Sequence, residues 1–192
     1  MKNKLYYRLK NWILDTSETW DKLSPKEKDA IAFAHTYINP EPIRGTTPPF
    51  SPEYRLAASG ETINQEYLRK GNIIPNITDI LDKLSQNTTQ KDIVVYRGVC
   101  YDLFNQMLNN TTGEQTTDLI ETGVLQTSLV KGHELPADIY LRIYIPAGTK
   151  ALYLGNVNYE QHLYEIDIMT GAHLSIVSAD AKYLNCMLQS TN

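Results

Sequence analysis

The sequence predicts an α+β fold in one domain of 192 residues, with a mainly helical part over residues 1–90 and a mainly β part over residues 91–192. Helical spacing of apolar residues and helix-start signals dominate the first part, while strand-like apolar runs begin at Ile93 and continue toward the C-terminus. Helices that precede the strands, instead of alternating with them, are typical of this class. Hydrophobic residues make up 42% of the chain, which suffices for one buried core.

The helical part contains the predicted helices, which span residues 1–20, 24–37, 54–70 and 77–84. The second has the clearest start, because Ser24 can act as N-cap, Pro25 takes the first helical position and Glu27 can close a capping box. Gly71 is a C-cap for the third helix. Residues 43–52 are rich in proline, threonine and glycine, and the sequence predicts a loop there.

The β part contains predicted strands at residues 93–99, 125–129, 140–146 and 164–171, with a short helix at 102–108. Three of these strands carry an ionisable residue in an apolar run: Arg97, Arg142 and Glu165. A buried charge is costly unless it meets a partner or a ligand, and arginine pairs well with phosphate or carboxylate. We therefore expect a shared site for a ligand with negative charge. The alternative is an internal arginine–glutamate ion pair that closes a small sheet.

The composition excludes several other classes of function. A net charge of -4 and a pI of about 5.6 make nucleic acid an unlikely partner. Cys100 and Cys186 are too few for a disulfide scaffold, which favours a reducing compartment, and the scattered histidines form no metal-binding pattern. No signal peptide is visible and no apolar run reaches membrane-spanning length.

Several segments between residues 54 and 178 resemble segments of a known family and occur in the same order as in that family. They are a helix end with Asn64 and Leu68-Arg69, the arginine strand 94–99, the Ser/Thr-containing strand 124–129, the strand and turn 141–149, and the glutamate strand 164–171. This order resembles the bacterial mono-ADP-ribosyltransferase toxins of the Arg-Ser-Glu class. It resembles most closely the exoenzyme group of the actin-modifying binary toxins and the clostridial Rho-modifying exoenzymes.

The resemblance implies N-terminal helices followed by two short, roughly perpendicular β-sheets that form an NAD cleft. NAD would be the substrate and no metal would be needed. Glu165 would bind the 2′-hydroxyl of the nicotinamide ribose and stabilise the positive charge that develops as nicotinamide leaves. The implied catalytic residues are Glu165, Arg97 and Ser128. The implied NAD contacts are Arg97 at the diphosphate, the Gly98 backbone at the nicotinamide amide, and Arg142, Asn64, Arg69, Thr127 and Ser128.

Two positions depart from the family pattern. Gln126 replaces the first serine of Ser-Thr-Ser, and its amide could donate the same hydrogen bond to Glu165. Leu163 replaces the Gln or Glu that directs the acceptor, two residues before the catalytic glutamate. If the loop is bulged, the polar run 160–162 could substitute. Alternatively, Glu165 could be the first acid of the pattern and Asp167 the second, which restores a near-match to the family. This alignment spoils the spacing to Gly171, so we prefer Glu165 as the catalytic residue.

We therefore expect an enzyme, a mono-ADP-ribosyltransferase toxin or effector that transfers ADP-ribose from NAD to a macromolecular target, most simply a protein. An NAD glycohydrolase is one alternative, since the apolar Leu163 cannot direct an acceptor. A non-catalytic binding module is another, motivated by Gln126 and Leu163 together. Asn64 and Arg69 could equally cap a helix end. We expect a secreted or delivered effector that acts in a reducing cytosol, or otherwise a cytoplasmic protein.

Overall fold

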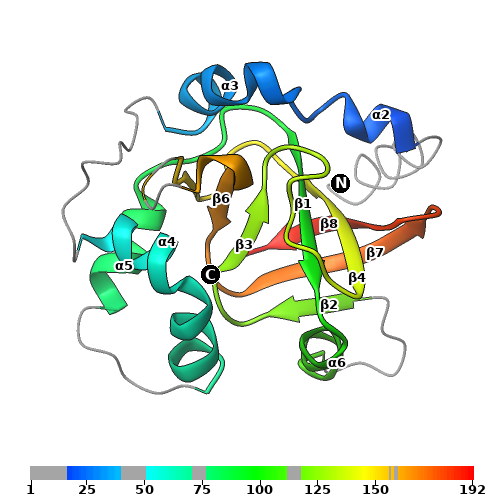
Figure 1. Ribbon diagram of the computed structural model, residues 1–192. Helices are drawn as coiled ribbons and strands as arrows, with labels where there is room; N and C mark the ends of the chain where they lie inside the picture. The colour runs from blue at the N-terminus through cyan, green and yellow to red at the C-terminus, as the bar shows by residue number, and fades with distance from the viewer. Residues whose placement is uncertain (1–16, 40–50, 71–76, 112–117, 156, 158–159) are drawn as a thin grey trace, which may run out of the picture.

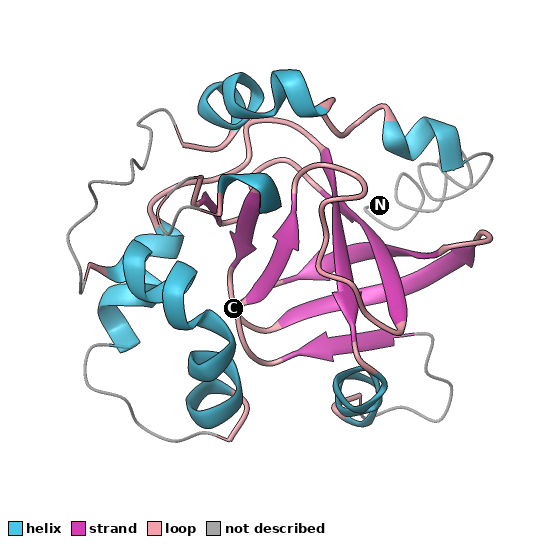
Figure 2. Cartoon of the chain, in the orientation of Figure 1, coloured by secondary structure: helices cyan, strands magenta, loops and turns pink. Residues whose placement is uncertain are grey.

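The first half of the chain forms helices that border a β-sheet formed by the second half (Figure 1, Figure 2). The computed structural model describes residues 17–39, 51–70, 77–111, 118–155, 157 and 160–192. The helices are α2 (Ser17–Asp21), α3 (Ala30–Tyr37), α4 (Pro52–Thr62), α5 (Ile77–Ser85) and α6 (Tyr101–Asn109), with the 3-10 turns η1 (Glu27–Asp29) and η3 (Gln161–Leu163) and the π-helical turn η2 (Ile63–Leu68). In Figure 1, α2 and α3 run along one side of the sheet, and α4 and α5 pack beside its β5–β6 end.

The predicted helices in the described residues are confirmed, with changes at their ends. The chain enters helical geometry at Glu27, and Ser24 does not cap it: the Ser24 hydroxyl donates to the Leu129 carbonyl at 2.9 Å instead. The capping-box prediction is therefore wrong, because a long-range acceptor competes for the hydroxyl. Most of the predicted helix 1–20, most of the loop 43–52 and the Gly71 cap lie outside the described residues.

The described strands form an eight-stranded sheet in the order β2-β7-β8-β4-β1-β3-β6-β5. Neighbouring strands are antiparallel except β4 and β8, which are parallel. The strands are β1 (Ile93–Val99), β2 (Asp118–Glu121), β3 (Leu125–Ser128), β4 (Ile139–Ile145), β5 (Ala151–Tyr153), β6 (Glu165–Ile168), β7 (Ala172–Ala179) and β8 (Tyr183–Ser190).

This arrangement differs from the two crossed sheets that we expected. The described strands form one continuous ladder, but its two halves meet at β1 and β3 through the single Cα pair Tyr96–Ser128. By contrast, β1 pairs with β4 along its whole length, from Ile93 to Val99. The sheet is therefore continuous but weakly joined at the β1–β3 boundary, where β3 tilts away from β1 in Figure 1.

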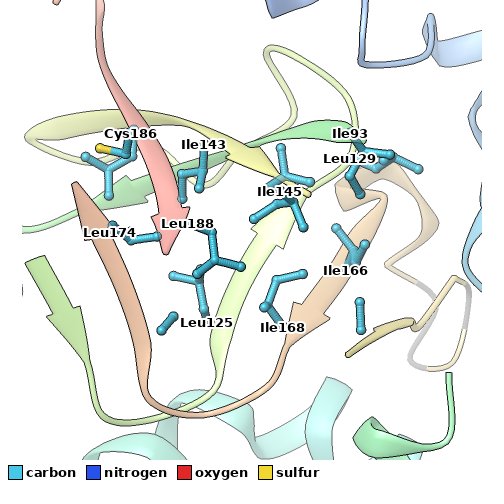
Figure 3. Packing of buried hydrophobic residues seen from close by; sticks show 14 of the residues in the cluster. Ile93, Leu125, Leu129, Ile143, Ile145, Ile166, Ile168, Leu174, Cys186 and Leu188 are labelled. Carbon is cyan, nitrogen blue, oxygen red and sulfur yellow. The ribbon is translucent and has the colours of Figure 1, made fainter. Parts of the chain in front are cut away.

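The main hydrophobic core bridges that boundary (Figure 3). Ile93 and Ile143 come from one half of the sheet, and Leu125, Ile166 and Ile168 come from the other, and all of them are completely buried in one cluster. A second cluster lies between β5 and the helices α4 and α5, with Leu56, Ile80, Leu84 and Leu152 at its centre. In the described part of the chain, no helix is long and apolar enough to cross a membrane.

Candidate active site

A pocket of about 670 Å³ opens where β1, β3 and β6 meet α4 and the segment after β3. Several residues that the sequence singled out line it: Arg97, Gly98, Gln126, Thr127, Ser128, Leu163 and Glu165. A volume of this size is typical of a site for a small molecule or cofactor. Arg97 and Glu165 thus line one pocket, at the weakly joined boundary of the sheet, whereas Arg142, the third charged strand residue of the predicted site, does not line it.

Arg97 and Arg69 meet at a buried carboxylate, that of Glu121 at the end of β2. Arg69 donates to Glu121 through Nε at 3.1 Å and through Nη2 at 2.9 Å, and Arg97 donates through Nη2 at 3.1 Å. The Gly123 N–H donates to Oε1 of the same carboxylate at 2.9 Å. An internal arginine–glutamate ion pair, the alternative reading of the sequence, is thus present, but with Glu121 instead of Glu165.

This triad keeps Glu121 ionised and holds Arg97 in place. Burial acts to raise the pKa of Glu121, but the charges and hydrogen bonds of Arg97 and Arg69, with the Gly123 N–H, outweigh it and lower the pKa below its usual value. In the described part of the chain, Nη1 of Arg97 is buried and has no hydrogen-bond partner. An unsatisfied guanidinium N–H is costly, and Arg97 lines the pocket, so Arg97 is a candidate for binding an anionic ligand such as a phosphate.

Gln126 takes the contact that the sequence suggested for it. Its Nε2 donates to Oε1 of Glu165 at 3.0 Å, and its own Oε1 accepts from Nδ2 of Asn64 at 3.2 Å. Asn64 is fully buried in the π-helical turn η2 and also binds the Val124 backbone. The Val124 N–H donates to Oδ1 of Asn64 at 2.7 Å, and Nδ2 of Asn64 donates to the Val124 carbonyl at 3.0 Å. Asn64 therefore supports Gln126 from behind and does not line the pocket.

The close approach of α4 fixes the Gln126 amide from the other side. A Cβ atom placed on Gly60 would lie 2.3 Å from Nε2 of Gln126, so a side chain there would displace the amide. A glycine at this point of α4 thus makes room for a longer residue where the family has a serine.

The pKa of Glu165 is unusually high for a glutamate. Burial raises its pKa to about 7; the Gln126 hydrogen bond opposes the rise and the negative charge of Glu160 adds to it. Tyr164, the preceding residue, has a positive φ of 46°, a conformation rare for side chains of its size. This strained residue turns the chain from η3 into β6, which sets the direction of Glu165 at the start of the strand.

The turn before Glu165 contains a polar residue that could take the acceptor-directing role that Leu163 cannot. Leu163 lines the pocket, and so does Glu160, which lies just before η3. Among the polar candidates 160–162, Glu160 is the one that reaches the pocket, while Gln161 donates to the Tyr153 hydroxyl at 2.7 Å. A carboxylate thus accompanies Glu165 in the pocket, from a position five residues earlier.

Thr127, Ser128 and Gly98 shape the pocket wall. The Thr127 hydroxyl donates to the Ile166 carbonyl at 2.7 Å, and the Ser128 hydroxyl donates to the Val130 carbonyl at 3.0 Å, so both hold the backbone. A Cβ atom on Gly98 would lie 2.1 Å from the Leu135 carbonyl oxygen. The segment after β3 therefore crosses directly over the β1 backbone at Gly98.

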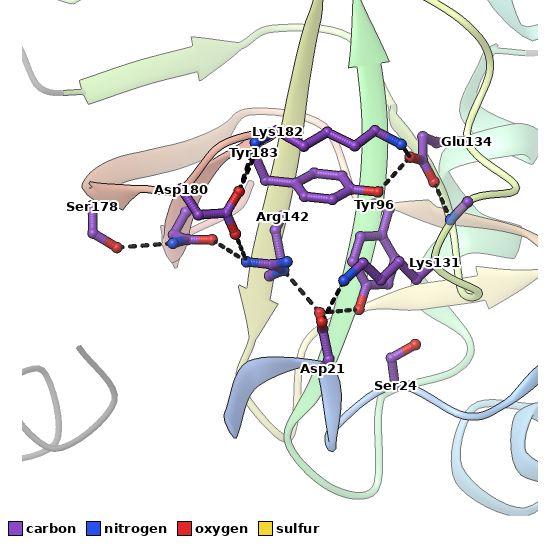
Figure 4. A network of polar contacts seen from close by, with 12 residues as sticks. Asp21, Ser24, Tyr96, Lys131, Glu134, Arg142, Ser178, Asp180, Lys182 and Tyr183 are labelled. Atoms are coloured by element: carbon purple, nitrogen blue, oxygen red, sulfur yellow. Dashed lines mark hydrogen bonds and ion pairs between the residues drawn. The ribbon is translucent and has the colours of Figure 1, made fainter. Parts of the chain in front are cut away.

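Arg142 lies apart from this pocket, in a separate polar network (Figure 4). Its guanidinium contacts Asp180 at 2.6 Å and Asn185 at 2.9 Å through Nη1, and its Nε lies 2.9 Å from Asp21. The Tyr96 hydroxyl donates to the same Asp21 carboxylate at 2.9 Å. The structure thus does not bring Arg142 to Arg97 and Glu165. It uses Arg142 to fasten the N-terminal helix α2 to the sheet.

Sequence reasoning missed Glu121, and it treated Asp167 only as an alternative acid. Glu121 ends a short strand that was not predicted from the sequence, and its contact with the Gly123 N–H became visible only in the structure. Asp167 is completely buried and does not line the pocket, which supports the frame with Glu165 as the reacting carboxylate. The described residues contain no cluster of three potential metal ligands.

Comparisons with known proteins agree with this geometry. Residues 54–185 match the family model of the ADP-ribosyltransferase exoenzymes. C3stau2 from Staphylococcus aureus, solved with NAD, is similar over 85% of this chain and 96% of its own, with a TM-score of 0.61 and 19% identity. Plx2a, an ADP-ribosyltransferase toxin from Paenibacillus larvae, has the same coverage and TM-score at 17% identity. A comparison with curated protein sequences found no match.

A longer toxin component is also similar. BECa of a binary enterotoxin from Clostridium perfringens, solved with NADH, matches over 84% of this chain and 48% of its own, with a TM-score of 0.59 and 16% identity. These structural likenesses confirm the predicted α+β, ADP-ribosyltransferase-like fold, but not its two perpendicular sheets. The protein is an NAD-dependent mono-ADP-ribosyltransferase of the toxin class, as the sequence predicted. The family match covers well over half of the chain, and the chain belongs to the ADP-ribosyltransferase exoenzyme family.

Proposed function

We propose that this enzyme cleaves NAD in the pocket between Arg97 and Glu165 and transfers ADP-ribose to a protein target. The observation that carries this assignment is that a buried arginine with an unpaired nitrogen and a carboxylate with a pKa of about 7 line one pocket, in a chain of this family. A delivered or secreted effector is the form of protein that fits this activity.

Arg97 binds the NAD diphosphate in this proposal. Glu121, which also accepts from Arg69, holds the Arg97 guanidinium from one side, and Nη1 of Arg97 has no hydrogen-bond partner in the described part of the chain. The Gly98 backbone lies beside it, at the point where the segment after β3 covers β1, and would meet the nicotinamide amide. A charge-assisted hydrogen bond of this kind fixes both the position and the orientation of the substrate.

Glu165 supplies the catalytic charge. As the bond between the ribose C1′ and the nicotinamide nitrogen breaks, its electron pair leaves with neutral nicotinamide and positive charge develops on the ribose. A carboxylate already oriented by the Gln126 amide at 3.0 Å stabilises this charge without further rearrangement. The acceptor atom then bonds to C1′ and releases its proton. Since Glu165 acts as a carboxylate, we expect the rate to rise with pH through about 7.

Glu160 is the residue that we expect to contact the protein acceptor. It lines the same pocket, and its charge is felt at Glu165, whereas Leu163 offers no polar atom. If Glu160 contacts no acceptor on a protein target, water takes the ADP-ribose and the enzyme acts as an NAD glycohydrolase. The apolar Leu163 is the observation that favours this second candidate.

Labelled NAD separates these functions. The purified protein is incubated with NAD labelled in its ADP-ribose part, with and without eukaryotic or bacterial lysate, and both free nicotinamide and labelled protein are measured. We expect Glu165→Gln to lower nicotinamide release about 100- to 1,000-fold while NAD binding changes little. The matched change Glu160→Gln, in the same pocket, should lower protein labelling more than nicotinamide release.

Each outcome assigns the function differently. A labelled band that is lost in Glu165→Gln identifies a transferase and its target. Release of nicotinamide without any labelled band identifies a glycohydrolase. A wild-type protein that neither binds NAD nor releases nicotinamide with any lysate refutes the catalytic proposal and leaves a binding module.

A further inference from the structure

Asp167 of β6 is a buried acid that the proposed chemistry does not use. Its exposed fraction is 0%, and in the described part of the chain neither of its carboxyl oxygens has a hydrogen-bond partner. A carboxylate placed in this way loses its hydration without gaining a hydrogen-bond donor, so a side chain of this kind needs an explanation.

The strand register explains why Asp167 is buried away from solvent. Asp167 lies opposite Gln126 on β3 and opposite Leu152 on β5. Directly opposed residues share one face of the sheet, and Leu152 on that face belongs to the apolar cluster under α4 and α5. Asp167 therefore lies between this apolar cluster and the amide that holds Glu165, with no route to solvent.

Asp167 and Glu165 also share that face, because they are two residues apart on one strand. Their Cα atoms are about 7 Å apart along the strand, a separation that side chains of this length can close. Two carboxylates are only hydrogen-bond acceptors, so a contact between them becomes a hydrogen bond only when one of them carries a proton. Two neighbouring buried carboxyls do not both ionise near neutral pH.

We propose that Asp167 is a positioning residue that keeps its proton at neutral pH and donates it in a hydrogen bond to Glu165, so that the negative charge of the pair stays on Glu165. This inference rests on the proposed function of Glu165. The two environments decide which acid is charged. Glu165 reaches the pocket and accepts from Gln126, whereas Asp167 reaches neither water nor a donor.

The surrounding charges agree with this division. Burial raises the pKa of Asp167 well above its usual value, and the charge of Glu165 raises it further, while Arg97 on β1 acts in the opposite direction. Glu160 faces Glu165 from the loop before η3 and opposes its ionisation. Arg97 contacts Glu121 through Nη2 at 3.1 Å, and in the described part of the chain no hydrogen bond joins its guanidinium to Asp167. Asp167 thus stays the protonated partner.

Two substitutions distinguish a neutral donor from a second negative charge. Asp167→Asn keeps the shape and a donor, and Asp167→Leu removes the donor and fits the apolar surroundings. Nicotinamide release from NAD is followed from pH 5 to 9 for both variants and the wild type. We expect Asp167→Asn to keep the wild-type pH midpoint. We expect Asp167→Leu to move it up by about one pH unit, with roughly 10-fold lower activity on the acidic side, since the charge on Glu165 loses a donor.

Opposite shifts would overturn the proposal. If Asp167 were ionised, both variants would remove a repulsive charge, and both midpoints would move to lower pH. An unchanged midpoint in Asp167→Leu would show that the two carboxyls are not linked, and would overturn it as well. Thermal unfolding of both variants confirms that the folded protein is being compared.

A measurement on the wild-type protein needs neither a variant nor catalysis. Infrared spectra of protein with isotope-labelled aspartate, recorded across the same pH range, should show a protonated aspartic acid at pH 7. Its absence at pH 7 refutes the proposal. If that band is present but no NAD is cleaved at any pH, the proton assignment stands and the proposed catalytic function fails, so the two failures are distinguishable.

Discussion

The Glu121→Gln substitution tests whether the buried Arg69–Glu121–Arg97 triad holds the arginine of the pocket. Glu121 is 1% exposed and accepts from two guanidinium groups, so the change leaves two buried cations without a counterion and points an amide N–H toward donors. Removing one partner of such a buried cluster costs about 3–5 kcal/mol. For a chain of this size, that corresponds to a melting temperature roughly 6–20 °C lower.

Denaturant unfolding and thermal unfolding of the variant and the wild type measure this loss. Its pH dependence provides a second check. The pKa of Glu121 is lowered in the folded protein, so its contribution is complete above the ordinary glutamate pKa and is lost as the pH falls through the lowered value. The difference in stability between wild type and variant should therefore be largest near neutral pH and shrink in acid.

Glu66→Gln is the matched control, because it makes the same chemical change in another ion pair of similar length. Glu66 lies 2.9 Å from Lys70 on the adjoining helical turn, but both side chains are more than half exposed. Exposed pairs of this spacing contribute about 0.3–0.5 kcal/mol. If the two variants lose the same stability, burial is not what makes the Glu121 triad important, and the reasoning fails.

Three further substitutions test other contacts. Gln126→Leu removes the donor to Glu165 at 3.0 Å, so the pKa of Glu165 should rise above about 7 and the pH midpoint of nicotinamide release should rise with it; an unchanged midpoint contradicts this. Arg142→Met should lower the stability, measured by urea unfolding, by about 3–5 kcal/mol and leave NAD affinity unchanged. A large loss of NAD affinity would instead support the phosphate contact that the sequence predicted for Arg142. Gly98→Ala places a Cβ 2.1 Å from the Leu135 carbonyl, and should cost about 1–3 kcal/mol and weaken NAD binding in calorimetry; wild-type values would refute the close crossing.

Strands β1, β3, β4 and β6 and the pocket residues nearest to NAD chemistry were predictable from the sequence, because their signals are local, whereas β2, β5, β7 and β8 were not predicted individually. Arg97 and Glu165 stand out as charges in apolar strands, and Gln126 stands out against the family pattern. The sequence left open whether the Gln126 amide donates to Glu165, and the structure has this contact at 3.0 Å. In each case the residue type and its place on a strand already limited what the side chain could do.

The partners of charged residues were not predictable in the same way. Arg97 finds Glu121 and Arg142 finds Asp21 and Asp180, and these contacts depend on how distant segments fold together. The same holds for Ser24, whose local capping signal was overridden by a carbonyl 105 residues away. A sequence shows that a buried charge needs a counterion, but several acids qualify until the topology is known.

The single Tyr96–Ser128 pair between the halves of the sheet has a consequence for how the pocket responds to a ligand. The register between β1 and β3 contains this Cα pair alone, and the apolar cluster that includes Leu125, Ile166 and Ile143 joins the two halves. Packing of this kind has no preferred direction, so the boundary can yield slightly in angle without breaking hydrogen bonds. A substrate that spans from Arg97 to Glu165 contacts both halves of the sheet and restricts their relative motion at the boundary. Slower amide exchange in β3, β5 and β6 would therefore accompany binding, far beyond the residues that touch the ligand.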